Sequence, residues 1–502
     1  MPAFVIPALL AALPFAFGLV ALWLGMDANW DLRNYHWYNA YAYLEGRHGF
    51  DLLAAQIPTF HNPMLDVPFF VAAQALPARV VGFLLGSLHG LNALALYALG
   101  RRLGVEAGWA LAAAVTGALG AAAVAEIGTV FYDNVLSLGF YASVLVIVSQ
   151  WERLFGARAW VAAMIALAAG IPAGIAFGLK MTMVVYAVGA CFGFLLAPDR
   201  PGRRLMVSFC FGLGVLAGLA VSAGPWMWFL WERYDNPMFP YFNQVFKSPW
   251  GLFQSYRDGM YLDKLTPANI FFFPFFFSFD TRLTSEVDFR DFRVLAAYLA
   301  VPLALVAWCG RGARGYLMAA VSLAYVTWLM LSAIYRYLIP LEMLAPLLLL
   351  LALGRHRAVA GVALALLLVT TRPADWGRAA WADKAVEVTL PAIESPDRTM
   401  VLMAGHEPLS FLLPAFPPAM RFLRIDSTFT NIRETNVRFN DVMRAAVAAH
   451  DGPLAMLFTS WEIEDVRRKL DEYGLVMDES RCRHPSSPIG TAPYAYCPVR
   501  RP

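Results

Sequence analysis

The segment PAFVIPALLAALPFAFGLVALWLGM, residues 2–26, contains no charged side chain. A helix of this length, rising about 1.5 Å per residue, crosses the roughly 30 Å hydrocarbon core of a bilayer. A cleaved signal peptide is the alternative. It would need a basic residue before the apolar run, a shorter apolar core and an A-x-A site before Asp27, and the sequence has none of these. We therefore interpret the segment as an uncleaved transmembrane helix.

The composition extends this interpretation to the rest of the chain. Hydrophobic residues make up 59% and charged residues 15% of the 502 positions, and the mean hydropathy is +0.54. A soluble domain carries about a quarter charged residues, so the bilayer is the main solvent of this chain. The formal net charge is only +3, and no basic run is interleaved with aromatic residues, which argues against a nucleic-acid partner.

Apolar runs recur along the sequence and predict about eleven membrane spans. They are Phe4–Gly25, Val80–Leu99, Ala110–Val124, Val135–Val148, Ala159–Leu179, Met183–Ala197, Leu205–Leu230, Val294–Trp308, Tyr316–Ile334, Leu338–Gly354 and Ala358–Thr371. The predicted fold class is an α-helical polytopic membrane protein, with a transmembrane domain over residues 1–371, interfacial helices in its outer loops and a small α/β domain at the C-terminal end.

Arginine occurs in every second connection between these runs. The groups are Arg101–Arg102, Arg153 with Arg158, Arg200 with Arg203–Arg204, Arg311 with Arg314, and Arg355 with Arg357. Basic residues in short loops resist translocation, so this side is predicted to be cytoplasmic, together with the N-terminus. The outer side then receives residues 27–63, the turn 126–134, Lys180, a long loop over about 232–293 and the turn Tyr335–Arg336.

The long outer loop contains NIFFFPFFFSF, residues 269–279. This stretch is too short and too interrupted by proline to cross the bilayer. We interpret it as a re-entrant or interfacial segment, and a core segment beneath the outer domain is the alternative.

An odd number of spans places the tail, residues 372–502, on the outer side as well. The runs VLMAG, MRFLRID and LAMLFTS are typical of strands, whereas Phe439–Ala449 and Glu462–Glu472 are typical of helices. The tail is therefore predicted to be a small periplasmic α/β domain.

Five cysteines divide into two groups. Cys482 and Cys497 lie in a polar, proline-rich stretch and suit a disulfide in an oxidising compartment. A zinc site is the alternative, but only one imidazole, that of His484, is nearby. The other three lie in or beside apolar helices and are interpreted as packing residues: Cys191, Cys210 and Cys309.

The first outer loop begins MDANWDLRNYHWYNAYAYLEGRHGFD, residues 26–51. Helical spacing of Asp31, Asn34, Tyr35, Tyr38 and Ala42 predicts an amphipathic helix at the membrane surface, with its aromatic rings at headgroup depth. Its charged end is interpreted as part of a solvated interfacial belt: Arg47, His48 and Asp51.

Two acids in this loop call for a different interpretation. Asp27 and Asp31 immediately follow a spanning helix, where an ionisable group needs a partner or a function. Arg33 and His36 are close to Asp31 in the sequence. A carboxylate near the membrane face can deprotonate a hydroxyl acceptor as a general base, while a solvated interfacial charge is the alternative.

These motifs resemble the GT-C superfamily of integral-membrane glycosyltransferases. Asp31, followed by N-Y-H and an aromatic helix ending in L-E-G-R, is similar to the first periplasmic loop of that family. HNPMLDVPFF (61–70) resembles the proline segment that follows it. Other similar stretches are TVFYDNVLSLGFY (129–141), GIPAGIAFGLKMTMVV (170–185), YDNPMFPYFNQVFKSP (234–249) and IYRYLIP (334–340). The resemblance covers residues 1–375, in the order of the family.

The resemblance implies an enzyme of the bacterial inner membrane. Such an enzyme passes a sugar from a polyprenyl-phosphate donor to a glycan or lipid acceptor on the periplasmic face. Asp31 matches the catalytic acid and Asp133 the second acid of the site. The sequence departs from paired carboxylates at both positions, because Leu32 follows Asp31 and Asn134 follows Asp133. We therefore expect chemistry without a metal or other cofactor.

The transfer needs a base for the acceptor and positive charge for the leaving phosphate. Asp31 is predicted to be the base, and Asp27 is predicted to be one of the residues that bind the substrate or the lipid phosphate. Arg336 and Lys180, with Arg233 as a third candidate, are predicted to bind the lipid phosphate. The alternative for Lys180 and Arg336 is snorkelling at helix ends.

Three further residues have two interpretations each. His36 and His61 are predicted to orient the phosphate or the acceptor, although a lone imidazole is more often simply hydrogen-bonded. Glu126 is equally compatible with a site residue and with a solvated turn residue.

Two other functions are compatible with the helices and the lipid. A lipid-linked-sugar transporter or flippase should show inverted repeats and ionisable residues at mid-membrane depth. The predicted spans are nearly free of charge at their centres, which favours an enzyme at the outer interface. A non-catalytic subunit of envelope polysaccharide assembly would leave Asp31, Asp133 and Arg336 without a role.

Overall fold

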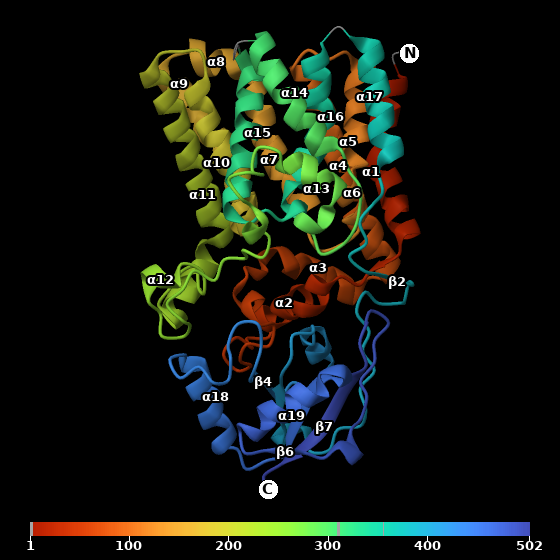
Figure 1. Ribbon diagram of the computed structural model, residues 1–502, viewed down its shortest axis with the longest axis vertical. Helices are drawn as coiled ribbons and strands as arrows, with labels where there is room; N and C mark the ends of the chain where they lie inside the picture. Colours follow the sequence, from red (N-terminus) through yellow and green to blue (C-terminus); the bar gives the residue numbers. More distant parts are fainter. Residues whose placement is uncertain (1–3, 309–311, 355) are drawn as a thin grey trace. The chain divides into compact units, whose positions relative to one another are not determined.

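The computed structural model describes residues 4–308, 312–354 and 356–502 (Figure 1). Three residues named above, Cys309, Arg311 and Arg355, lie outside these ranges. The chain divides into two compact units. We call Met1–Leu24, Gly82–Pro225 and Arg257–Trp376 the helical unit, and Gly25–Val81, Trp226–Tyr256 and Gly377–Pro502 the mixed unit.

Long apolar helices build the helical unit, and some of them continue past its boundaries. They and their shorter connecting helices are α1 (Val5–Leu24), α4 (Ala78–Arg102), α5 (Ala107–Ala118), α6 (Ala121–Ala125), α7 (Asp133–Ser149), α8 (Trp151–Gly156), α9 (Ala159–Leu179), α10 (Val184–Gly193), α11 (Pro201–Tyr234), α13 (Phe273–Phe279), α14 (Arg293–Trp308), α15 (Gly312–Leu331), α16 (Ile339–Leu353) and α17 (Arg357–Thr370). A 3₁₀ turn, η8 (Tyr335–Leu338), leads into α16.

Within the described residues, six helices are long and apolar enough to cross a membrane: Val5–Leu24, Ala78–Arg102, Ala159–Leu179, Pro201–Tyr234, Gly312–Leu331 and Tyr335–Leu353. Five shorter apolar helices fall on the other predicted runs: Ala107–Ala118, Asp133–Ser149, Met181–Leu196, Arg293–Ala304 and Arg357–Thr370. The chain is a helical membrane protein with a small C-terminal sheet, and the count of eleven spans stays a prediction.

Arginine-bearing connections contact one another inside the helical unit. Arg314, near the start of α15, donates to the carbonyl of Leu103 between α4 and α5 at 2.9 Å. Arg203, in the first turn of α11, donates to the carbonyl of Leu154 in α8 at 2.7 Å. In each of these two pairs, connections that are far apart in the sequence therefore lie side by side.

Glycine allows α9 and α11 to approach closely. A Cβ atom built at Gly174 would lie 2.1 Å from the carbonyl oxygen of Val215, and one at Gly214 would lie 2.0 Å from that of Leu167. Small residues at such crossings permit the close backbone packing on which membrane helices depend. The stretch 170–180 therefore has a packing role that leads directly to Lys180.

The phenylalanine-rich part of the long loop forms a short helix with one buried face and one exposed face. In α13, Phe273 and Phe277 are buried, whereas Phe276 and Phe279 are exposed, as is Phe271 just before the helix. Exposed aromatic rings on a helix of seven residues fit an interfacial segment better than a buried core segment.

A five-stranded sheet forms the centre of the mixed unit. Its strands are β3 (Met400–Met403), β4 (Arg421–Arg424), β5 (Leu454–Thr459), β6 (Val476–Met477) and β7 (Tyr494–Arg500), in the order β4-β3-β5-β7-β6. β3 runs parallel to β4 and β5, while β7 runs antiparallel to β5 and β6. Helices α18 (Arg438–Ala448) and α19 (Ile463–Asp471) lie on the two predicted helical stretches. Their apolar sides join the sheet in one core that includes Met443, Val466 and Met456.

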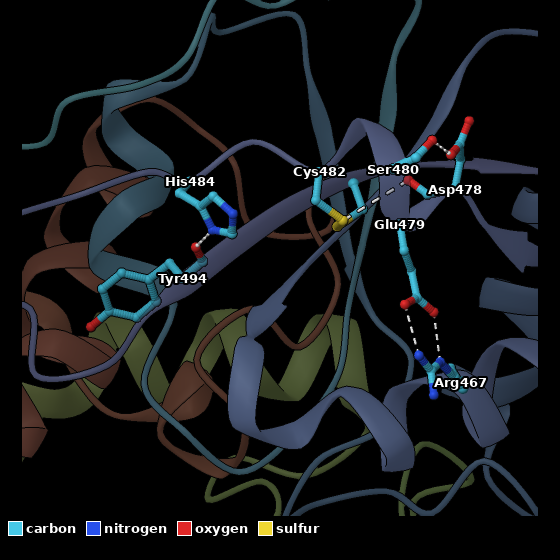
Figure 2. Close-up of a disulfide and its surroundings, with 8 residues drawn as sticks. Arg467, Asp478, Glu479, Ser480, Cys482, His484 and Tyr494 are labelled. Carbon is cyan, nitrogen blue, oxygen red and sulfur yellow. Dashed lines mark hydrogen bonds and ion pairs between the residues drawn. A yellow bond between two sulfur atoms is a disulfide. The ribbon is translucent and has the colours of Figure 1, made fainter.

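A disulfide joins Cys482 to Cys497 in this unit. Figure 2 shows it beside Asp478 and Glu479, whose carboxylate pairs with Arg467. The His484 imidazole, the one nitrogen ligand considered for a zinc site, contacts the carbonyl of Tyr494 at 2.9 Å instead (Figure 2).

The first outer loop belongs to the mixed unit and supplies its remaining elements. They are β1 (Met26–Asp27), which pairs with β2 (Arg378–Ala379), a π-helical turn (Leu32–His36), α2 (Trp37–Leu44), short 3₁₀ turns (Ile57–Phe60 and Pro63–Leu65), α3 (Asp66–Ala75) and, from a later loop, α12 (Asn243–Phe246). The predicted helix after Asp31 is present, but Tyr35 and Tyr38 are buried. These rings therefore pack within the protein, and their depth in the membrane stays a prediction.

The loop also adds to the edge of the C-terminal sheet. The Leu52 amide donates to the carbonyl of Phe422 at 2.9 Å, and the Arg424 amide donates to the carbonyl of Leu52 at 3.0 Å. One residue of the loop thus pairs with β4 as a strand would.

The solvated belt predicted for Arg47, His48 and Asp51 is wrong. Arg47 and Asp51 are buried and form a two-point ion pair, with Nε–Oδ2 at 2.6 Å and Nη2–Oδ1 at 2.8 Å. Arg47 also donates to the carbonyl of Met420, and Asp51 accepts from the Phe422 amide. These contacts with the β4 region supply hydrogen-bond partners for the buried pair. His48 is partly buried, and burial and then the nearby Arg233 charge lower its pKa to about 4.

Candidate functional site

The densest charged cluster of the helical unit is built around one carboxylate. Asp133 is the first residue of α7, Lys180 directly follows α9, and Arg336 lies in η8. Lys180 Nζ is 2.7 Å and Arg336 Nε is 3.7 Å from the same Asp133 oxygen, Oδ2. The side chain of Asp133 is 1% exposed, against 15% for Lys180 and 13% for Arg336. Three predicted site residues from distant parts of the sequence therefore meet.

Local structure holds this cluster in place. Tyr132 adopts a left-handed conformation (φ 67°) immediately before α7, which turns the chain so that Asp133 begins the helix. A carboxylate is favoured there by the helix dipole. Phe131 connects the two cations, because its carbonyl accepts from Lys180 at 2.7 Å and its ring lies 4.1 Å from the Arg336 guanidinium carbon.

Glu126 is a further member of the cluster. It ends α6, is fully buried, and accepts from the Asn134 amide through Oε2 at 3.1 Å. Its interpretation as a solvated turn residue is therefore wrong, because the turn folds back onto the start of α7. Burial and then the Asp133 carboxylate raise the pKa of Glu126 well above its ordinary value, while Lys180 and Arg336 lower it to a smaller extent.

A second set of buried charges secures the other end of α6. Asp291 accepts from the Ala121 amide at 2.8 Å and pairs with Arg293 at 2.5 Å. Glu342, in α16, accepts from the Ala123 amide at 3.0 Å. Two carboxylates thus satisfy amides at the N-terminus of α6, the favourable end of the helix dipole for negative charge. The sequence analysis missed these residues, although Glu342 is an acid within an apolar run.

Asp31 lies in the mixed unit, at the start of a polar network. It is buried and directly precedes the π-helical turn, a local irregularity that is frequent at functional sites. The Tyr35 hydroxyl donates to Asp31 Oδ2 at 3.2 Å. The Tyr35 ring in turn contacts the rings of His36 and His61, with centroids 4.0 and 5.1 Å apart. The two predicted histidines therefore gather around the residue that contacts Asp31.

Each of these imidazoles has a partner that the sequence analysis did not name. His36 Nδ1 is 2.6 Å from Asp66 Oδ1, and His61 Nε2 is 2.9 Å from the Tyr241 hydroxyl. Asp66 begins α3 and is buried, so it fixes the orientation of the His36 ring. The signal that could have indicated it is an acid between proline and phenylalanine in HNPMLDVPFF.

Two other predicted residues have local contacts in the mixed unit. Asp27 accepts from both the backbone amide and the side-chain amide of Asn29, at 3.0 and 2.7 Å. Arg233 packs so closely on Gly49 that a Cβ atom there would lie 1.6 Å from Nη2. A role in loop structure accounts for both sets of contacts.

Arg33, which the sequence analysis noted only as a neighbour of Asp31, is also fixed. It is buried, and it donates to the carbonyl of Ala28 at 3.1 Å and to the Thr491 hydroxyl at 2.7 Å. The second contact ties the first loop to the end of the chain within the mixed unit.

Within the described residues, no group of three or more His, Cys, Asp or Glu side chains is arranged so that it could hold a metal ion. Comparison with protein-family models, curated proteins and solved structures finds no match to this chain.

Proposed function

We propose that this chain is a membrane glycosyltransferase that moves a sugar from a polyprenyl-phosphate donor to an acceptor hydroxyl. The observation that carries the proposal is the convergence of Lys180 and Arg336 on one oxygen of Asp133. Two cations exceed the charge of one carboxylate, and both are more exposed than the carboxylate is. When Glu126 is neutral, an anion that reaches this cluster meets net positive charge.

A donor phosphate suits the two cations for different reasons. The planar guanidinium of Arg336 can present two parallel N–H donors to two phosphate oxygens, while Lys180 supplies a compact point charge. Negative charge grows on the phosphate as the bond to the sugar breaks. Fixed positive charge in a largely buried site therefore stabilises the transition state more than the ground state.

An apolar cavity in the helical unit supports a lipid-linked substrate. Its volume is about 320 Å³, and α14, α15, the start of α16 and the segment before α13 line it. Leu341 in its wall follows Arg336 by five positions, and ring contacts lead from Tyr325 in the wall through Trp328 and Phe277 to Tyr335 in η8. A nearly all-carbon lining accepts a stretch of hydrocarbon chain and disfavours a free sugar nucleotide.

The proposal assigns proton removal to Asp31. The acceptor oxygen attacks the anomeric carbon while its proton passes to the Asp31 carboxylate. The bond between that carbon and the phosphate oxygen breaks, and the electron pair leaves with the polyprenyl phosphate. The Tyr35 hydroxyl holds the Asp31 carboxylate, and the His36–Asp66 pair supports Tyr35. Asp31 follows the end of α1 by seven positions in the sequence.

We also propose the number of spans and the orientation of the chain. With eleven spans and the arginine connections in the cytoplasm, the turn around Asp133 and residues 372–502 face the periplasm of a bacterial inner membrane. Glycans and lipids that carry a free hydroxyl are then the acceptors.

Replacing Asp31 by asparagine tests the assignment. The change keeps the size and most hydrogen bonds but removes the base, so we expect the transfer rate to fall about 10²- to 10⁴-fold. The assay uses the purified full chain in lipid discs, synthetic short-chain polyprenyl-phosphate hexoses and pentoses, and a membrane extract as the acceptor source. Release of polyprenyl phosphate is measured. Binding of the donor should stay near the wild-type level.

Glu45→Gln is the matched control, because Glu45 is an exposed acid of the same loop. It should leave the rate unchanged. An unchanged rate in Asp31→Asn would remove the base from the proposal. Movement of intact donor across the membrane of sealed vesicles that contain the full chain, without any release of polyprenyl phosphate, would establish the transporter instead.

A further inference from the structure

The carboxyl groups of Glu126 and Asp133 each have one oxygen with a donor and one without. Glu126 Oε2 accepts from the Asn134 amide, and Asp133 Oδ2 faces Lys180. The other oxygens, Glu126 Oε1 and Asp133 Oδ1, are buried and have no hydrogen-bond donor among the described residues. Buried carboxylate oxygens are costly without donors. A proton placed between the two carboxyl groups would satisfy both.

We propose that Glu126 and Asp133 share one proton, and that this proton controls the affinity of the cluster for the donor phosphate. This inference rests on the proposed function and adds a regulator to it. With Glu126 protonated, Asp133, Lys180 and Arg336 sum to one positive charge. With Glu126 ionised, the sum is zero, and the attraction for an anion is lost.

The electrostatics of the turn agree with a protonated Glu126. Burial raises the pKa of Glu126 first, the Asp133 charge raises it next, and a hydrogen bond to Asp133 raises it further. Lys180 and Arg336 act in the opposite direction with smaller effects. On α4, His89 faces the same turn through Asn134, with Nδ1 3.3 Å from Nδ2.

The acids at the opposite end of α6 already have donors. Asp291 pairs with Arg293, and Glu342 accepts from the Ala123 amide. Asp291, Glu342 and Glu126 all lie at the ends of α6. Among these three acids, Glu126 is the one whose buried oxygen, Oε1, lacks within the described part of the chain a hydrogen-bond partner that a proton would supply.

The sign of the pH dependence follows from this arrangement. Below the raised pKa of Glu126 the carboxyl is neutral, and the cluster binds an anion. As the pH rises through that pKa, the carboxylate forms and the affinity falls. The phosphodiester of a polyprenyl-phosphate sugar keeps one negative charge throughout this range, so the dependence belongs to the protein.

Donor affinity as a function of pH tests the proposal. The full chain in lipid discs is titrated with a synthetic short-chain polyprenyl-phosphate hexose from about pH 5 to about pH 9. We expect wild-type affinity to fall roughly tenfold across this range, because the cluster loses its net positive charge when Glu126 ionises. Glu126→Gln should keep the low-pH affinity throughout. The glutamine amide can accept from Asn134 and donate to Asp133, as the protonated acid does.

Glu106→Gln is the control, because Glu106 is an exposed acid that pairs with Arg357. It should keep the wild-type pH profile. A wild-type profile in Glu126→Gln would overturn the proton-sharing pair and leave the glycosyltransferase proposal standing. A flat wild-type profile would overturn the inference without any variant. Absence of donor binding by the wild type at every pH would overturn the proposed function and this inference together.

Discussion

At the scale of single residues, Arg336 is the clearest link between structure and the proposed chemistry. Its guanidinium contacts Asp133 and the Phe131 ring at once, and its side chain keeps 13% exposure. A snorkelling arginine would extend toward solvent. The Arg336 side chain instead turns toward the buried Asp133 carboxylate, with Nε 3.7 Å from Oδ2.

Arg336→Ala should lower the turnover number and raise the apparent KM for donor, together roughly 10- to 100-fold, because charged hydrogen bonds contribute about 1.5–3 kcal/mol. Arg336→Lys keeps the charge but loses the fork, so its loss should be partial. The measurement is single-substrate kinetics with the short-chain donor. Arg357→Ala, an exposed arginine paired with Glu106, should have wild-type kinetics. An Arg336→Ala protein with wild-type kinetics would reduce Arg336 to a structural anchor.

Residues of the candidate site differ in how far the sequence could predict them. Asp133 was predicted from the family resemblance, and Lys180 and Arg336 were predicted because cations at the outer ends of helices can bind a lipid phosphate. Their contact with one another was not predictable, since α7, α9 and η8 are brought together only by packing. Glu126 was left between two interpretations, because a turn residue is solvated or buried according to where the turn folds.

At the scale of elements, the crossing of α9 and α11 positions the end of α9, and Lys180 follows that end directly. The crossing is as close as backbone atoms permit, with no room for a Cβ atom at Gly174. Packing of this kind replaces the hydrophobic effect, which gives little driving force between helices in lipid.

Gly174→Ala should therefore destabilise the helical unit by about 1–3 kcal/mol, as overpacking does in a tight interior. Gly212→Ala is the same substitution in α11 at a position where a Cβ atom would meet only Cys191 Sγ, at an ordinary contact distance of 3.7 Å. It should be neutral or slightly stabilising, because alanine is the better helix former. Thermal unfolding in detergent compares the two. Equal melting temperatures would show that the crossing relaxes without cost.

Helices and strands were easier to predict from the sequence than the first outer loop. Long apolar runs and alternating strands carry their own periodicity, so α9, α18 and β5 lie on predicted stretches. The burial of Arg47 and Asp51 depends instead on contacts with residues 420–422, which are about 370 positions away. No local pattern reports such a contact, and a charged loop is by default expected to be solvated.

At the scale of the whole molecule, the arginines in the short connections predict the orientation of the chain in the membrane, and this prediction can be tested. Arg203 and Arg314 each contact another basic connection, and basic residues in short loops remain in the cytoplasm. A periplasmic reporter enzyme fused after Thr371 should therefore be active, and one fused after Arg204 should be inactive. The reverse pattern would place the Asp133 cluster on the cytoplasmic side and would exclude the proposed periplasmic transfer.

The pairing of Leu52 with β4 has a consequence for biogenesis. The first loop leaves the ribosome early, whereas β4 is made about 370 residues later. Until then, the loop has no edge on which to dock, and its buried groups stay hydrated. The C-terminal sheet in turn receives part of its edge from a segment that was made first. The first loop and the tail therefore complete this sheet edge together, after β4 has been made, and a tail made alone lacks part of its edge.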